Sequence, residues 1–361
     1  MVIGPNGHIV EELALFLRNR FVLQNATLGT LHDEAYILVD WWSFLDLRQC
    51  EWGAVDQSMV LGWVRLMEPH MEKARITRKL SVMTRFQKCL FQQWRPDELP
   101  TSIFGGDSAV VSYPASQLRT KKGRYTPDMH EAEAIMSELS DEEDPYLASR
   151  NWLIGMWMLH SGLRAQGVSQ LSLRAISRSL VAEKCLPADA ICLSRLNRFD
   201  ARSNVLSRLQ VLEDVGREHL FIPVVEKGTK SREVAAPFSL VIETLEFVWS
   251  ERAGFVKRRG RSEDVVFLSK KTAGKIEPGS IGDIVKAAFK KCQIDGSGHR
   301  LRALYACRLV RKRYERAVEA HGRLWEPVQV LMEAAELLGH DDPETLRTYL
   351  DRALREDHWS F

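Results

Sequence analysis

A tyrosine near the end of the chain is the first residue whose position suggests chemistry. Tyr349 lies nine residues after His340, which closes a Leu-Gly-His step. Two arginines, a lysine, two histidines and a late tyrosine are side chains that can together attack a phosphodiester without a metal ion. Tyr349 and His340 are joined in this set by three earlier clusters, which are Ser161-Gly162-Leu163-Arg164, Glu226-Lys227-Gly228-Thr229-Lys230 and His299-Arg300-Leu301-Arg302.

Arg164 and Arg302 are the candidates for binding the phosphate. A guanidinium is planar, stays protonated and donates two parallel hydrogen bonds to phosphate oxygens. Arginines from two separate elements can hold both non-bridging oxygens and stabilise the extra negative charge on pentacoordinate phosphorus. Arg302 lies three residues after His299, so these two side chains share one helix face.

Tyr349 is the candidate nucleophile. Because the pKa of a free tyrosine is about 10, its phenol needs a base or nearby positive charge to lose the proton. His299, His340 and the arginines can supply that field. The leaving oxygen needs a proton in turn, and a lysine in a hairpin tip can donate it. Lys227 is the first candidate for this role and Lys230 the second.

The elements that must position these residues are mostly helical. Two β-prone runs, 219–225 and 233–236, flank the lysines and predict a hairpin with Gly228 in its turn. Thr30, Asp56 and Thr77 are expected to cap their helices. Apolar residues at helical spacing predict helices over residues 8–23, 30–47, 56–67, 77–94, 129–139, 146–161, 239–252, 281–291, 301–320, 328–338 and 345–355.

Each candidate residue has a simpler explanation when it is taken alone. An arginine is usually a surface residue, a histidine can cap a helix or lie in a core, and a hairpin lysine is usually solvated. A tyrosine in a helix is usually half-buried. The combination favours a functional site, because five separate elements occur in one order along the chain.

In this order and spacing the chain resembles the tyrosine recombinase (phage integrase) family. Arg164 matches the family's first arginine, and Lys227 matches its β-hairpin lysine. The resemblance implies a site-specific recombinase that forms a 3′-phosphotyrosyl bond and frees a 5′-hydroxyl. The other matches are His299 and Arg302 in the His-x-x-Arg box, His340 in the Leu-Gly-His box, and Tyr349 as the nucleophile.

The resemblance also implies an architecture and a set of partners. Residues 1–112 would form a helical core-binding (SAM-like) DNA-binding domain, and residues 113–127 a basic linker. Residues 128–361 would form the catalytic domain with a C-terminal tail, and the two domains would close as a C-shaped clamp on duplex DNA. The fold class is thus expected to be mainly α with a small β-hairpin. Tetramers would act on two paired sites without ATP, metal or another cofactor, with accessory recombinases or directionality factors as further expected partners.

The chain also departs from the family's pattern. The family usually has an acidic residue three positions after the first arginine, where this chain has Gly167, so Arg164 must obtain its support elsewhere. Two stretches are long for the family, with additional segments at residues 174–212 and 317–327. These lengths suggest a specialised subgroup carried by a transposon or another mobile element.

The charge of the chain is distributed unevenly. The net charge is only +2, but residues 126–149 contain eight acids and no lysine or arginine, and residues 252–300 contain twelve lysines and arginines against five acids. Patches of basic charge are typical of contact with a phosphate backbone. The predicted phosphate contacts are Arg78, Lys79, Arg85 and Lys88 on the fourth helix and Lys121, Lys122 and Arg124 in the linker.

Composition limits the remaining possibilities. With 45% hydrophobic and 27% charged residues, the chain is typical of soluble globular proteins. It lacks an uninterrupted apolar run of membrane-spanning length and a recognisable signal peptide. Six cysteines without metal-ligand spacing favour a reducing compartment, so a cytoplasmic, nucleoid-associated protein is expected.

Three other functions remain open at this point. A type IB topoisomerase or a telomere resolvase uses much of the same catalytic set. A non-catalytic DNA-binding regulator derived from an integrase would be expected to lack an arginine or the tyrosine, and this chain has both. A metal-dependent nuclease would need a carboxylate cluster, whereas the acidic residues 128–144 are more simply a solvated helix face and loop.

The last residues form an apolar group that invites a partner. Leu350, Leu354, Trp359 and Phe361 are four large apolar side chains within the final twelve residues. An exposed cluster of this kind usually binds another surface. The prediction is that the tail docks onto a neighbouring protomer, with packing within the same chain as the alternative.

Overall fold

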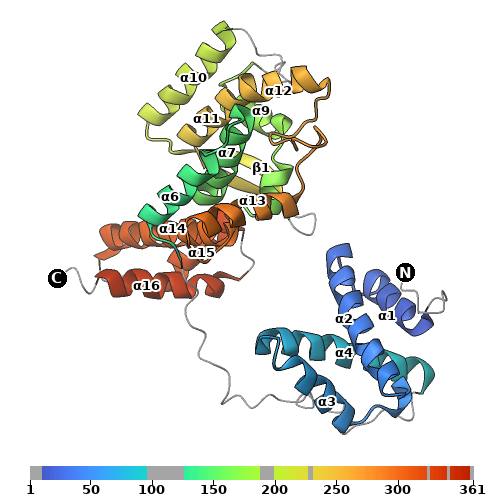
Figure 1. The fold of residues 1–361 in the computed structure, drawn as a ribbon. Helices are drawn as coiled ribbons and strands as arrows, with labels where there is room; N and C mark the ends of the chain where they lie inside the picture. The colour runs from blue at the N-terminus through green and yellow to red at the C-terminus, as the bar shows by residue number, and fades with distance from the viewer. Residues whose placement is uncertain are drawn as a thin grey trace. The chain divides into compact units, whose positions relative to one another are not determined.

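The computed structural model describes residues 10–95, 126–187, 199–226, 231–322, 326–339 and 342–357. It contains two compact units, Met1–Gly123 and Arg124–Phe361 (Figure 1). Most of the predicted linker lies outside the described residues, so the predicted domain boundaries stay a prediction.

The first unit is helical. It consists of α1 (Glu11–Val22), α2 (Leu28–Leu47), a short 3₁₀ helix η1 (Trp52–Ala54), α3 (Gln57–Met67) and α4 (Lys73–Trp94). Its core is aromatic: the rings of Trp41 and Trp63 lie 4.9 Å apart, and those of Phe16 and Phe86 lie 5.6 Å apart. These pairs contribute packing energy beyond the area that they bury.

Two of the three predicted helix caps in this unit are wrong. Asp56 is confirmed, because its side chain accepts a hydrogen bond from the Met59 N–H at 2.8 Å. Helix α2 is capped by Thr27, three residues before Thr30. Helix α4 begins at Lys73, so Thr77 lies inside it and its hydroxyl donates to the Lys73 carbonyl.

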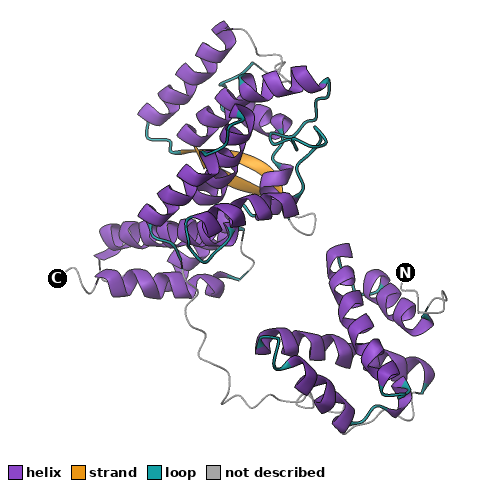
Figure 2. Cartoon of the chain, in the orientation of Figure 1, coloured by secondary structure: helices purple, strands orange, loops and turns teal. Residues whose placement is uncertain are grey.

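The second unit surrounds a two-stranded sheet with helices. Strands β1 (His219–Val225) and β2 (Ser231–Pro237) pair antiparallel, with His219 opposite Pro237 and Val225 opposite Ser231 (Figure 2). The predicted hairpin is confirmed, although its tip at 227–230 lies outside the described residues. The fold class, mainly α with a small β-hairpin, is also confirmed. The helices before the sheet are α6 (Met129–Ser140), α7 (Pro145–Ser161), α8 (Ala165–Gln170), α9 (Leu173–Ala182) and α10 (Phe199–Asp214).

The helices after the sheet form two groups. The single helix predicted over 239–252 is two helices, α11 (Phe238–Trp249) and α12 (Glu251–Arg259), because the backbone turns at Ser250 with ψ near −94°. Helix α13 (Pro278–Lys291) leads to a group that contains the catalytic candidates His299, Arg302 and Tyr349 (Figure 1). This group consists of α14 (Gly298–His321), α15 (Pro327–Leu338), the 3₁₀ helix η6 (Pro343–Leu346) and α16 (Arg347–Asp357).

Helices on both sides of residues 188–198, within the additional segment predicted at 174–212, contribute to the core. Ile176 and Leu180 of α9 and Val205 and Leu209 of α10 are fully buried in the cluster that also contains β1. The described parts of this segment are therefore integral to the second unit, and whether the segment is additional to the family's pattern stays a prediction.

The irregular segment between α12 and α13 depends on buried polar anchors. The Arg252 guanidinium donates to the carbonyls of Glu263, Val265 and Val266 at 2.7 to 3.2 Å. The Tyr146 hydroxyl donates to the Leu268 carbonyl at 2.8 Å. These bonds satisfy carbonyls that lack a strand partner, which is the requirement for burying irregular backbone.

Among the residues that the structure describes, no helix is both long enough and apolar enough to cross a membrane.

Arg252→Leu is expected to lower the free energy of unfolding by on the order of 3 kcal/mol, because several buried carbonyls lose a charged donor. The measurement is urea unfolding of the full chain. Arg258→Leu, at an exposed position on the same helix, is the matched control and should change little. Equal stability of the two variants would contradict the anchoring role of Arg252.

Candidate active site

Arg302 lies at the junction of three helices. It follows the start of α14 by about one turn, and its side chain is only 3% exposed. Its guanidinium donates to the Gly162 carbonyl, which ends α7, and to the Leu338 carbonyl, which ends α15, the latter at 2.8 Å. Both acceptors lie at the partially negative ends of helices. Arg302 therefore fixes the junction as well as being available as a phosphate candidate.

Two glycines allow the chain to turn at this junction. Gly162 ends α7 with φ of +64°, and Gly339 ends α15 with φ of +61°, a left-handed conformation that favours glycine. A Cβ atom on Gly162 would also lie 2.5 Å from Cδ1 of Tyr305. The Gly-Leu and Leu-Gly steps that were noted in the sequence thus end two helices where Arg302 binds.

Arg164 projects from the turn that follows α7. Leu163 is buried, and Arg164 is the N-cap residue of α8 with a side chain that is 40% exposed. Its Nη1 donates to Oε2 of Glu226 at 2.6 Å. Arg164 is thus the more exposed of the two predicted phosphate ligands, and a carboxylate from the end of β1 holds it.

Glu226 is the centre of a cluster of three arginines. Oε1 of this carboxylate accepts from Arg232 Nη2 at 3.3 Å and lies 4.0 Å from Arg302 Nη1. Arg232 is 12% exposed and also donates to the Leu337 carbonyl at 2.9 Å. Burial by itself would raise the pKa of Glu226, but the three arginines together hold it below the ordinary value. Glu226 is therefore ionised at neutral pH.

The environment of Arg302 is unfavourable for a cation. Burial, followed by the charge of Arg164, lowers its pKa to about 9, although Glu226 and Tyr349 act in the opposite direction. A pKa of about 9 leaves the side chain protonated at neutral pH. A bound anion would relieve this unfavourable environment, which is the electrostatic setting of a preorganised phosphate site.

Tyr349 lies on α16 next to α14. Its ring is half-buried against an apolar cluster that includes Leu331, Leu338 and Leu346. It is close enough to Arg302 to influence the pKa of that guanidinium. His299 is exposed in the first turn of α14, one turn before Arg302. The structure therefore brings Arg164, Arg302 and Tyr349 into one region, with His299 on the same helix as Arg302.

Several predicted residues cannot be placed. Lys227, Lys230 and His340 lie outside the described residues, as do the linker residues Lys121, Lys122 and Arg124. Their predicted roles stay predictions.

Sequence reasoning missed Arg232 and the role of Glu226. Glu226 was part of a noted motif, but nothing in the motif shows that its side chain binds the arginine cluster. Arg232 follows the cluster in β2, where the alternation of buried and exposed residues is irregular. The one feature of the sequence that could have drawn attention to Arg232 is the presence of an arginine directly before a short predicted strand.

The basic face that was predicted on α4 is largely paired with acids. Arg78 contacts Asp33 at 2.8 Å, Arg85 contacts Glu34 at 3.0 Å, and Lys79 is 8% exposed and hydrogen-bonded to Asp40. Lys79 is therefore a mostly buried partner of the half-exposed Asp40, and its predicted role as a phosphate contact stays a prediction. The acids come from α2, and contacts between α2 and α4 could not be deduced from one helix face. Lys88 is half-buried, and its predicted role stays a prediction.

The apolar tail packs partly within its own chain. Leu350 is 1% exposed, and Leu354 contacts the same apolar cluster as Tyr349. For these two residues the structure shows packing within the same chain, which was the alternative to docking onto a neighbouring protomer. Trp359 and Phe361 lie outside the described residues, so the docking prediction for them is untested.

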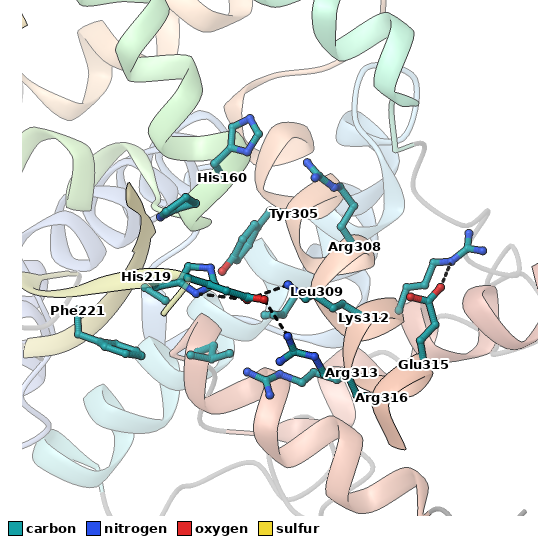
Figure 3. A pocket seen from close by; sticks show the side chains of 15 residues that line it. His160, His219, Phe221, Tyr305, Arg308, Leu309, Lys312, Arg313, Glu315 and Arg316 are labelled. Atoms are coloured by element: carbon teal, nitrogen blue, oxygen red, sulfur yellow. Dashed lines mark hydrogen bonds and ion pairs between the residues drawn. The ribbon is translucent and has the colours of Figure 1, made fainter. Parts of the chain in front are cut away.

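A cavity of about 690 Å³ borders the site through Tyr305 and Leu337 (Figure 3). It lies between β1 and α14 and contains none of the predicted catalytic residues. Its basic side chains are partly neutralised, because Glu218 contacts Lys312 at 2.8 Å and Arg316 at 3.0 Å. In the described parts of the chain, no three His, Cys, Asp or Glu side chains come together as metal ligands would.

Comparison with known proteins identifies the fold. No protein-family model and no curated protein matches the sequence. Solved structures match over nearly the whole chain. A lambda integrase dimer bound to a COC′ core site has a TM-score of 0.55 at 11% identity, with 95% of each chain covered. The XerH site-specific recombinase in a post-cleavage complex with palindromic difH substrate has a TM-score of 0.53 at 15% identity, covering 96% of this chain and 82% of that one.

A third structure belongs to the same class. The Tn1549 transposon integrase in complex with transposon right end DNA has a TM-score of 0.51 at 12% identity, covering 96% of this chain and 98% of that one. The three structures are recombinases or integrases that share one architecture. The chain therefore has the fold of the tyrosine recombinases.

The stability that Glu226 provides is expected to depend on pH in a defined direction. Because the folded-state pKa of Glu226 lies below its ordinary value of 4.5, its contribution is complete above about pH 4.5 and is lost as the pH falls through the folded-state pKa. Glu226→Gln should thus melt below the wild type at pH 7, and the difference should shrink at pH 3. Glu233→Gln, at an exposed position of the same hairpin, is the control. A difference that stays constant over this range would argue against the ionised cluster.

Proposed function

We propose that this protein is a site-specific DNA strand transferase that cleaves and rejoins DNA through a 3′-phosphotyrosyl intermediate on Tyr349. The observation that carries the proposal is the convergence of Arg164 and Arg302 in the region where α16 presents a tyrosine. The fold supports the same conclusion. Duplex DNA is the proposed substrate, and a homo-oligomer on paired sites is the proposed assembly, since the similar lambda integrase was solved as a dimer on a core site.

The proposed reaction conserves the number of phosphoester bonds. Oη of Tyr349 attacks the scissile phosphorus as its proton leaves, with His299 and His340 as candidate acceptors. A Tyr–O–P bond forms, and the bond from phosphorus to the 5′-oxygen breaks. The leaving oxygen takes a proton, for which Lys227 is the candidate donor. A 5′-hydroxyl from another strand then reverses the sequence, so that no external energy source is required.

The two arginines have different roles in this proposal. Arg164 is 40% exposed and can contact a non-bridging oxygen directly. Arg302 is buried and bound to two helix-terminal carbonyls, so its charge acts from beneath the site or becomes available through a local rearrangement. Both stabilise the charge that develops on phosphorus, and neither needs a metal ion to do so.

The alternative of a topoisomerase shares this chemistry. A topoisomerase relaxes supercoiled DNA without site preference, whereas a recombinase exchanges strands between defined sites. Relaxation of a plasmid without any target site would favour the alternative. A transposon-borne or other mobile-element role belongs to the same proposal and would be established by identifying the target site.

The nucleophile can be tested on a nicked suicide substrate, which traps the covalent intermediate because the short 5′ product diffuses away. Wild-type protein is expected to give a 3′ adduct that resists EDTA, and Tyr349→Phe is expected to give none. Tyr314→Phe, which alters a tyrosine beside the same apolar cluster, is the control and should retain the adduct. An adduct in Tyr349→Phe would refute the assignment.

Arg164→Ala is expected to slow adduct formation by about 100- to 1,000-fold, the loss typical of one donor in an oxyanion-type site. Single-turnover cleavage at saturating DNA measures the effect, while DNA affinity should change much less because many phosphate contacts share it. Arg178→Ala, at an exposed position on α9, is the control. A normal cleavage rate in Arg164→Ala would exclude this arginine from the phosphate site.

A further inference from the structure

We propose that Glu226 is the positioning carboxylate of the phosphate-binding arginines, and that Gly167 is the residue that makes room for it. This inference rests on the proposed function, because it names the residue that orients the groups assigned to the phosphate. Glu226 itself would touch neither the DNA nor the nucleophile.

The first argument is the space above Gly167. This residue lies on α8, one turn after Arg164, where the family pattern has an acid. A Cβ atom built on Gly167 would lie 2.6 Å from Cδ2 of Leu163, 3.1 Å from Oε1 of Glu226 and 3.4 Å from Cγ of Glu226. Leu163 and the carboxylate of Glu226 thus occupy the space into which a side chain at position 167 would project. Any side chain at position 167 would crowd both residues.

The second argument is the set of bonds that Glu226 makes. Its Oε2 binds Arg164 Nη1 at 2.6 Å, and its Oε1 lies 3.4 Å from the backbone N–H of the same residue. Oε1 also accepts from Arg232. One carboxylate therefore sets both the backbone and the guanidinium of Arg164 while holding a second arginine in place. These contacts join β1, β2 and α8.

The third argument is the balance of charge. Three guanidinium groups and one carboxylate leave a net charge of +2 in the cluster. A phosphodiester carries one negative charge, and attack by a phenolate raises this to two on the pentacoordinate phosphorus. The cluster is therefore matched to the transition state more closely than to the ground state, which is the condition for faster chemistry. Without Glu226, three buried or half-buried cations would repel one another.

The test exchanges the acid between the two positions. Glu226→Ala and Gly167→Asp are each expected to slow single-turnover cleavage of the nicked substrate by about 100-fold, because the orientation of Arg164 is lost or crowded. The double variant Gly167→Asp/Glu226→Ala should recover much of that rate, because an acid on α8 then fills the space that Glu226 leaves. Leu163 lies close to position 167 in both variants that carry Gly167→Asp, so comparing these two variants isolates the effect of Glu226. Glu226→Asp should lie between the wild type and Glu226→Ala. Melting temperature and DNA affinity are measured on every variant.

The outcomes separate the two proposals. If the wild type forms no adduct, the proposed function is refuted and this inference is refuted with it. If the wild type forms the adduct and Glu226→Ala forms it at the same rate, only the positioning role is wrong. A double variant that is as stable as the wild type but as slow as Glu226→Ala would also overturn it. A double variant whose cleavage rate recovers more than its stability does supports the positioning role. If Glu226→Ala does not fold, the cleavage rates of Glu226→Asp and of the double variant test the positioning role instead.

Discussion

One buried carboxylate among three guanidinium groups is the interaction on which the catalytic unit depends. Arg164, Arg232 and Arg302 belong to separate elements, and like charges at this distance would push those elements apart in a poorly solvated interior. Glu226 reverses the sign of the interaction for all three. Glu226 directly follows β1. Its contacts therefore hold the hairpin, the turn after α7 and the start of α14 in one arrangement.

The helix ends around Arg302 show how the fold prepares this arrangement. The carbonyls that close α7 and α15 would be buried without partners if no donor reached them. Arg302 satisfies one from each helix: the carbonyl of the left-handed Gly162 itself, and the carbonyl of Leu338 directly before the left-handed Gly339. The residue that resembles a catalytic arginine is thus also a structural one. A loss of activity on its replacement would combine both effects.

The sequence was sufficient for most of the helices and for the hairpin, because these depend on local periodicity, but α8, α9 and α10 were not predicted. Side-chain chemistry and order along the chain suggested Arg164, Arg302 and Tyr349, and their catalytic roles stay a prediction. It was insufficient where a residue's surroundings come from distant parts of the chain. The pairing of Lys79 with Asp40 depends on how α2 packs against α4. The burial of Ile176 and Val205, within the segment 174–212, depends on the sheet and helices around them. Arg232 had no motif, and its partner lies across a hairpin.

Gly167 stands where the family pattern has an acid, and Glu226 supplies the carboxylate from another element. This difference has a consequence for recognising related chains. A motif that requires an acid one turn after the first arginine would reject this sequence, although the carboxylate is present in space. The pattern that describes this chain is a glycine at the helix position together with a glutamate directly before the hairpin lysine. Neither residue would be notable by itself. In this chain the acid that holds Arg164 is supplied by the hairpin and not by α8, so the placement of this arginine depends on how the hairpin packs against the turn after α7.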